Sequence, residues 1–171
     1  MGCWGITALE SDDGLDAVGC IRYNLPKNGQ LDLGEMLERL KKDQWNAPRD
    51  VKLGCSHTSP MALAEIIVKY LDGDPGSLDY DEEWAAKDNK FRSITSFTAS
   101  RSSLLELRDY LADTLKYARI RAKQQIKAGE LPGGWFDPKD WDRWQEHMEG
   151  LIHRLDGVTA DHSRRAARRL V

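Results

Sequence analysis

Long apolar runs are missing from this sequence, and so are the closely spaced cysteines of a disulfide framework. The longest unbroken apolar stretches span only a few residues, whereas a membrane-spanning helix needs about 18. The first ten residues contain neither a basic cluster nor an apolar stretch, which predicts that there is no signal peptide. The three cysteines, Cys3, Cys20 and Cys55, are odd in number and far apart. We therefore expect a cytoplasmic protein with free thiols and no membrane partner.

Motifs for metals, cofactors and catalysis are also missing. Cys55 and His57 are the one close pair of soft metal ligands, whereas a structural zinc site usually shows two such pairs. Gly133 and Gly134 are not followed by the lysine and hydroxyl residue of a phosphate-binding loop. The sequence thus predicts no metal and no cofactor, and it favours a protein that is not an enzyme. Whether Cys3, Cys20, Cys55 or His57 bind a metal is left open.

The composition that remains is typical of one globular domain. The chain has 171 residues, of which 40% are hydrophobic and 31% charged, and a chain of this length can bury roughly 70% of its unfolded surface. We expect one compact all-α domain over residues 1–171, with 1–10 as an N-terminal anchor segment and 158–171 as a basic C-terminal tail. One or two short strands are allowed for, and only 2–8 and 91–99 are candidates.

Three helices are expected in the first half of the chain. Ser11, Asp32 and Ser59 each precede an amphipathic or apolar stretch and are suitable N-caps, and proline follows the third. The first helix should end near Asn24 and the third at Gly73. Apolar residues cover nearly the whole circumference of the third helix, so we expect it to be the most buried.

The second half should form a long helical hairpin. Ser103 and Glu106 match a capping box, and apolar residues at spacings of three and four continue the pattern for some 24 residues, up to Gly129. Asp137 starts a further helix with an apolar face, and the connection between the two is short. A last short helix is expected over 159–170.

Charge is unevenly distributed along the chain, whose net charge is −3. Residues 1–90 hold 17 acids and 10 bases, and residues 91–171 hold 11 acids and 15 bases. The segment 72–83 contains six acids and no base, whereas 116–127 contains five bases and no acid. We expect these two segments to pair with each other. A nucleic-acid partner is disfavoured, because the protein is acidic overall and lacks a basic groove with interleaved aromatic residues.

Glu65 is the one ionisable residue in the apolar stretch 61–68. An unpaired buried carboxylate is costly, so its side chain should reach solvent or a hydrogen-bond donor. The alternative is a functional carboxylate.

The N-terminal motif carries a family resemblance. Its residues are Met1, Gly2, Trp4 and Gly5, followed by the acidic Asp12, Asp13 and Asp16. This opening resembles that of a small bacterial protein family of unknown function. Segments 62–67, 103–107 and 141–155 resemble further blocks of that family, whereas the basic helix and the arginine tail differ from its shorter ending. The resemblance implies no activity. Some small bacterial families of this kind serve as immunity or antitoxin partners.

Trp4 has two interpretations of its own. Its indole can clamp the N-terminus onto the core, and Gly2 and Gly5 allow the backbone to pass close to other elements. Alternatively, Trp4 and the neighbouring aspartates form a ligand pocket.

Two functions are consistent with these patterns. The leading hypothesis is a non-catalytic protein-binding module whose acidic surface, including Asp74, Asp79, Asp81 and Glu82, recognises a basic partner. The alternative is a small hydrolase or ligand-binding protein with an acidic cleft formed by Asp12, Asp13, Asp16 and Glu65. The sequence predicts no oligomeric state.

Overall fold

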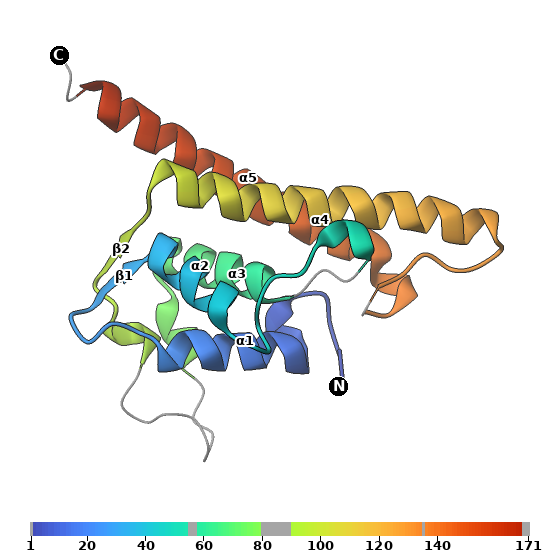
Figure 1. Ribbon diagram of the computed structural model, residues 1–171, viewed down its shortest axis with the longest axis horizontal. Helices are drawn as coiled ribbons and strands as arrows, with labels where there is room; N and C mark the ends of the chain where they lie inside the picture. Colours follow the sequence, from blue (N-terminus) through green and yellow to red (C-terminus); the bar gives the residue numbers. More distant parts are fainter. Residues whose placement is uncertain (1, 55–57, 80–89, 135, 169–171) are drawn as a thin grey trace.

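The computed structural model describes residues 2–54, 58–79, 90–134 and 136–168, with side chains described as far as residue 160. The α-helices are α1 (Asp12–Tyr23), α2 (Leu33–Lys42), α3 (Ser59–Leu71), α4 (Arg101–Lys127) and α5 (Trp141–Arg168) (Figure 1). Short 3-10 turns precede or connect them: η1 (Ala8–Glu10) lies before α1, and η2 (Val51–Leu53), η3 (Pro75–Leu78), η4 (Phe91–Ser93) and η5 (Pro138–Asp140) lie between the later helices. Two strands, β1 (Gln30–Asp32) and β2 (Ser96–Thr98), form a parallel pair. The expected all-α fold with short strands is confirmed.

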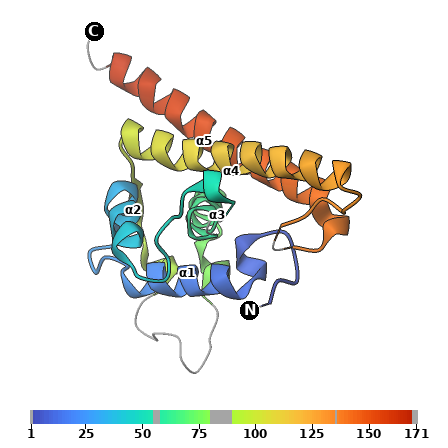
Figure 2. The same ribbon diagram turned by 45° about the vertical axis from the view of Figure 1, so that its right-hand side comes forward.

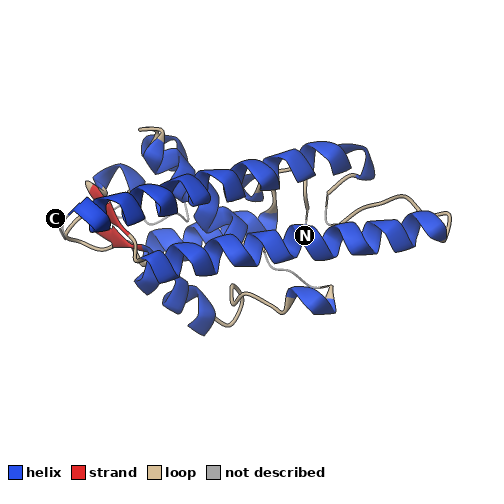
Figure 3. Cartoon of the chain, turned by 90° about the horizontal axis from the view of Figure 1, so that it is seen from above, coloured by secondary structure: helices blue, strands red, loops and turns tan. Residues whose placement is uncertain are grey.

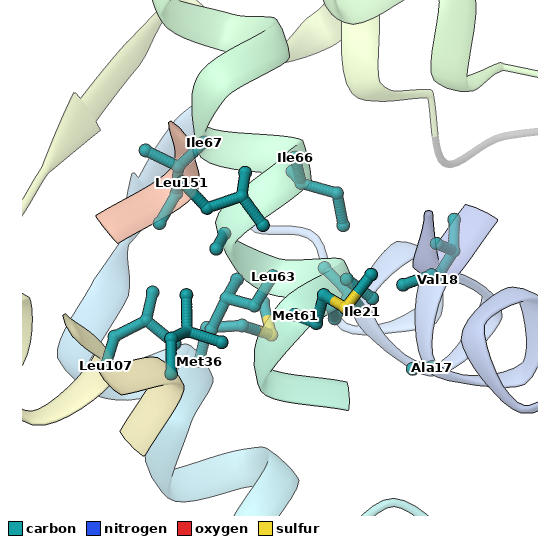
Figure 4. Packing of buried hydrophobic residues seen from close by; sticks show 14 of the residues in the cluster. Ala17, Val18, Ile21, Met36, Met61, Leu63, Ile66, Ile67, Leu107 and Leu151 are labelled. Atoms are coloured by element: carbon teal, nitrogen blue, oxygen red, sulfur yellow. The ribbon is translucent and has the colours of Figure 1, made fainter. Parts of the chain in front are cut away.

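Helix α3 is the centre of the fold. Every residue from Ser59 to Ile67 is buried, as the apolar circumference of this helix predicts. In Figure 2 it is seen nearly end-on, with α1, α2 and the pair α4 and α5 around it. Leu63 and Ile67 of α3 lie toward α2, α4 and α5, whereas Met61 and Ile66 lie toward α1 (Figure 4). Each such leucine or isoleucine stabilises the fold by about 1.5–3 kcal/mol.

Helices α4 and α5 form the expected C-terminal hairpin (Figures 1 and 3). Ion pairs between Arg108 and Asp156 and between Arg119 and Glu149 fix the antiparallel register. Near the connection, Phe136 stacks on Trp144 with 4.9 Å between the ring centroids. Within the described ranges, no helix is long and apolar enough to cross a membrane.

The first two helix starts agree with the sequence. The Ser11 hydroxyl accepts from the Gly14 amide at 3.1 Å, and the Asp32 carboxylate accepts from the Glu35 amide at 2.9 Å. At α3 the N-cap is Thr58, one residue earlier than expected. The reason is tertiary, because the Ser59 hydroxyl donates to the Asn46 carbonyl at 2.6 Å instead of capping the helix.

The hairpin helices are longer than the sequence predicts. Helix α4 starts at Arg101 with Ser100 as its N-cap, and Ser103 donates its amide to the Ser100 hydroxyl instead of capping the helix itself. The expected separate helix over 159–170 is wrong, because α5 continues without a break to residue 168 and includes most of the expected tail. Gly157 lowers helix stability by about 1 kcal/mol relative to alanine, but it does not end a helix that is packed on one face.

The strand prediction is corrected in one place. Residues 2–8 do not form a strand: Cys3 makes an isolated antiparallel bridge with Ser11. The second candidate segment, 91–99, contains β2, which pairs in parallel with β1, a strand that the sequence did not predict. A strand of three residues is too short to show an alternating pattern in the sequence. The pairing of β1 with β2 also joins Gln30 to Ser96, and this contact between distant residues depends on the tertiary fold.

The acidic and basic segments do not pair with each other in the part of the chain that the structure describes. The acids pair with Arg154, Lys69 and Arg92, through Asp72, Asp74 and Asp79 respectively. The bases Lys116 and Arg119 pair with Asp113 and Glu149. The ion pairs that these segments make therefore involve charges on the same helix or on an adjacent element, and not each other.

Candidate functional site

The carboxylates of the predicted acidic cleft are not brought together. Asp12 and Asp16 are exposed on α1, and Asp12 accepts a hydrogen bond from the Gly2 amide. Asp13 is half-buried on the same helix, whereas Glu65 is 5% exposed inside α3. Among the described residues, no three His, Cys, Asp or Glu side chains are placed to hold a metal ion. The three aspartates thus lie on α1, whereas the Glu65 carboxylate is buried within α3.

Glu65 instead fixes the N-terminal turn to the core. Its Oε1 accepts from the Ala8 amide at 2.9 Å, and its Oε2 accepts from the Leu9 amide at 3.3 Å. The His147 Nε2 of α5 lies 2.7 Å from Oε1. One buried carboxylate thus joins η1, α3 and α5. The Glu65 side chain was expected to reach either solvent or a hydrogen-bond donor, and the structure shows that it reaches hydrogen-bond donors.

Trp4 does not act as the expected buried clamp. Its side chain is 60% exposed, and the N-terminal segment is held by backbone pairing instead. The Trp4 amide donates to the Glu10 carbonyl at 3.0 Å, and the Asp12 amide donates to the Gly2 carbonyl at 3.0 Å. Because the backbone supplies the attachment, the indole is left at the surface.

The predicted acidic binding residues have different positions. Asp79 is buried and accepts from the Phe91 and Arg92 amides at 2.6 and 3.1 Å, so it is a structural residue and not part of an exposed acidic surface. Asp74 is exposed, and its pKa is lowered by the hydrogen bond from Lys69. Asp81 and Glu82 lie outside the described residues.

The two cysteines that the structure describes are poor nucleophiles. Partial burial raises the pKa of the Cys3 thiol above its usual value. Burial and the adjacent Asp43 carboxylate raise the pKa of Cys20 to about 11. A protonated thiol neither attacks substrates nor binds metals well. Cys55 and His57, the possible metal pair, lie outside the described residues.

We expect Cys20 to react slowly with thiol reagents in the folded protein. At pH 8 only about one thiol in a thousand is ionised at a pKa near 11, so labelling should be roughly 100-fold slower than in the unfolded chain. The rate can be measured with iodoacetamide in a Cys3→Ser, Cys55→Ser background, with and without urea. Equal rates in the two states would contradict the raised pKa.

An open groove lies between the C-terminal end of α1, β1 and the exposed side of α2. Its volume is about 230 Å³. Leu25, Leu31 and Met36 are buried and form an apolar floor, which is 3–7% exposed. The remaining lining residues are Tyr23, Asn24, Pro26, Asp32, Glu35 and Arg39. We name this feature the α1–α2 groove.

The polar wall of the α1–α2 groove is largely fixed. Arg39 donates to the Asn24 side-chain oxygen at 3.1 Å. The two Asp32 oxygens accept from the Glu35 amide at 2.9 Å and the Thr98 hydroxyl at 3.0 Å. By contrast, the Glu35 carboxylate has no hydrogen-bond or ion-pair partner within the described ranges. With two carboxylates against one guanidinium, the wall has an excess negative charge that suits a cationic group.

Two aromatic side chains stand at this end of the molecule. Tyr23 is 76% exposed and Trp45 is 77% exposed. The Asp43 carboxylate holds the backbone of Trp45 by accepting from its amide at 2.9 Å, and Asp43 also lies against Cys20 of α1. The hydrogen bonds to Trp45 and Asn46 hold the pKa of Asp43 below its usual value. The exposed indole thus belongs to a turn that Asp43 holds next to α1.

Sequence reasoning did not identify the α1–α2 groove. One signal was available, because Tyr23 lies away from the apolar stripe of Leu15, Val18 and Ile21 on its helix, which predicts a solvent-facing aromatic ring. The groove itself depends on how α1, β1 and α2 pack, and no local pattern records that.

Comparison of the chain with protein-family models, with curated proteins and with solved structures found no match. The resemblance to a small bacterial family therefore stays a prediction.

Proposed function

We propose that this protein is a non-catalytic protein-binding module that takes a basic segment of a partner protein into the α1–α2 groove. The observation that carries the proposal is the groove itself, in which the Glu35 carboxylate has no partner among the described residues and exposed Tyr23 stands beside a buried apolar floor. A concave site in which a few polar groups converge is a common place for a ligand to bind.

The expected contacts follow from the groove's chemistry. A lysine or arginine of the partner can pair with Glu35 and stack on Tyr23, which contributes about 0.5–1 kcal/mol at an exposed site. Trp45 can cover the flank of the bound segment, because tryptophan, tyrosine and arginine are the residue types that most often dominate interfaces. The apolar floor is only 3–7% exposed, so burial of partner atoms against it adds a smaller contribution than the polar and aromatic contacts.

The absence of a catalytic role is part of the proposal. Both described cysteines have raised thiol pKa values, and the Glu65 oxygens are occupied by backbone amides and His147. In its narrower form, suggested by the family resemblance, the basic partner is a toxin that the protein neutralises in the cytoplasm.

Selection from a displayed peptide library tests this proposal without a named partner. Peptides recovered on the wild-type protein should be rich in lysine or arginine next to apolar residues. Their affinity should fall at least about ten-fold in Tyr23→Ala and in Glu35→Lys, and it should weaken with salt.

Glu38→Lys is the matched control for Glu35→Lys, because Glu38 is exposed on the same helix and pairs with Lys41 outside the groove. It makes the same change in net charge. Peptides that bind all three variants equally well, or no recovered peptide at all, would overturn the proposed function.

A further inference from the structure

A second surface lies at the other end of the molecule, on the outer face of α4. Lys116, Ile120, Lys123 and Lys127 follow each other at spacings of four, three and four, so they form one stripe along the helix. All four are exposed. We name them the lysine stripe. In Figures 1 and 3 the end of α4 that carries them points away from β1 and β2. The α1–α2 groove, by contrast, is lined by Leu31 and Asp32 of β1.

We propose that the lysine stripe docks an acidic amphipathic helix of a partner protein. A heptad-like spacing is what one helix presents to another, and here the residues on that seam are three cations and one isoleucine. The complementary helix would carry apolar residues against Ile120 and glutamate or aspartate against the lysines. This inference is independent of the proposed function of the α1–α2 groove.

The charges of the stripe are incompletely neutralised. Lys116 lies 4.0 Å from Asp113, whereas Lys123 and Lys127 have no hydrogen-bond or ion-pair partner in the described part of the chain. Arg119, Lys123 and Lys127 follow at intervals of four, and like charges at this spacing repel each other in a helix. An anionic partner would remove this repulsion.

Apolar side chains accompany the lysines. Ile120 is 43% exposed, Ile126 is 59% exposed and Leu131, just beyond the helix, is 73% exposed. Ile120 and the lysine stems give a docked helix apolar surface to bury, whereas Ile126 lies about a quarter turn around α4 from the stripe.

The chemistry of the stripe favours a protein over a nucleic acid or a lipid surface. Arginine is the better phosphate ligand, and both arginines of this segment are engaged: Arg119 with Glu149 and Gln145, and Arg121 with the Val51 carbonyl. The lysines that are left are point charges suited to carboxylates. Three exposed apolar residues are also too few for a membrane-binding face.

The test uses the full chain and a synthetic amphipathic helix with leucine at positions a and d and glutamate at positions e and g of each heptad. Titration calorimetry at low salt should detect binding to the wild-type protein. In the double variant Lys123→Glu, Lys127→Glu, the affinity should fall at least about ten-fold. The double variant Lys27→Glu, Lys42→Glu changes net charge equally on exposed residues elsewhere, and it should bind the peptide nearly as well as the wild type.

Four results would overturn the inference. The first is no binding of the acidic helix, and the second is equal loss in both double variants. The third is tighter binding of a DNA duplex or of phosphatidylserine vesicles than of the peptide. The fourth is an effect of Lys123→Glu, Lys127→Glu on stability alone, as expected if the lysines only complement the dipole of α4. Circular dichroism of each variant separates misfolding from lost binding, and Lys123→Gln, Lys127→Gln replaces any variant that does not fold.

Discussion

Changing Glu65 to alanine is expected to lower the free energy of unfolding by about 3–5 kcal/mol, because it leaves buried donors without their acceptor. The amides of Ala8 and Leu9 and the ring of His147 all lose the same carboxylate. The N-terminal turn should detach first, since η1 has this side chain as its link to α3 and α5. Urea unfolding followed by circular dichroism measures the loss.

Glu65→Gln should be intermediate. It preserves the volume of the side chain, but one of its two polar ends becomes a donor that faces an amide or the imidazole, and we expect a loss of about 1–3 kcal/mol. Asp16→Ala is the control, because Asp16 is exposed on α1, and surface changes usually stay within about 0.5 kcal/mol. If Glu65→Ala lost no more stability than Asp16→Ala, the anchoring role of Glu65 would be refuted.

Gly14→Ala should also destabilise the protein strongly, although alanine is the better helix former. A Cβ atom added at Gly14 would lie 1.7 Å from the Ala8 carbonyl oxygen and 2.4 Å from the carbonyl carbon. The neighbour is backbone, and Ala8 is itself fixed by Glu65 and by the Ser11 hydroxyl at 2.8 Å. Relief of this clash requires η1 to move, and we expect a net loss of about 2–4 kcal/mol.

Gly19→Ala provides the matched comparison in the same helix. Nothing lies within 4 Å of a Cβ atom at Gly19, so alanine should stabilise the protein by about 0.5–1 kcal/mol through its helix propensity. The two substitutions are chemically identical and should have opposite signs in thermal and urea unfolding. A stabilised Gly14→Ala would show that η1 does not pack on α1 as described.

The helix starts show how far the sequence could predict the fold. Ser11 and Asp32 are local caps, since the acceptor and the amide that it binds are three residues apart in both cases. Ser59, followed by proline and an apolar stretch, is also a suitable N-cap by sequence, yet its hydroxyl binds Asn46, which is 13 residues away. The prediction failed by one residue where a distant partner competed for the side chain.

The candidate site was less predictable than the fold. Glu65 could be recognised as unusual, because a carboxylate interrupts an apolar stretch, but its partners are 56, 57 and 82 residues away in sequence. Asp79 looked like one of several surface acids and proved to be a buried cap for the turn at Phe91. In both cases the sequence did not reveal which groups the carboxylate binds.

The sequence by itself determined the helical class, the order of the helices, the hairpin and the burial of α3, because capping and apolar periodicity act between residues that are three or four apart. Tertiary structure alone decided which distant parts of the chain meet. It brought Glu65 to His147, paired β1 with β2, and placed α1, β1 and α2 around the α1–α2 groove. These features depend on the packing angles between whole elements, and packing brings together residues that share no local pattern.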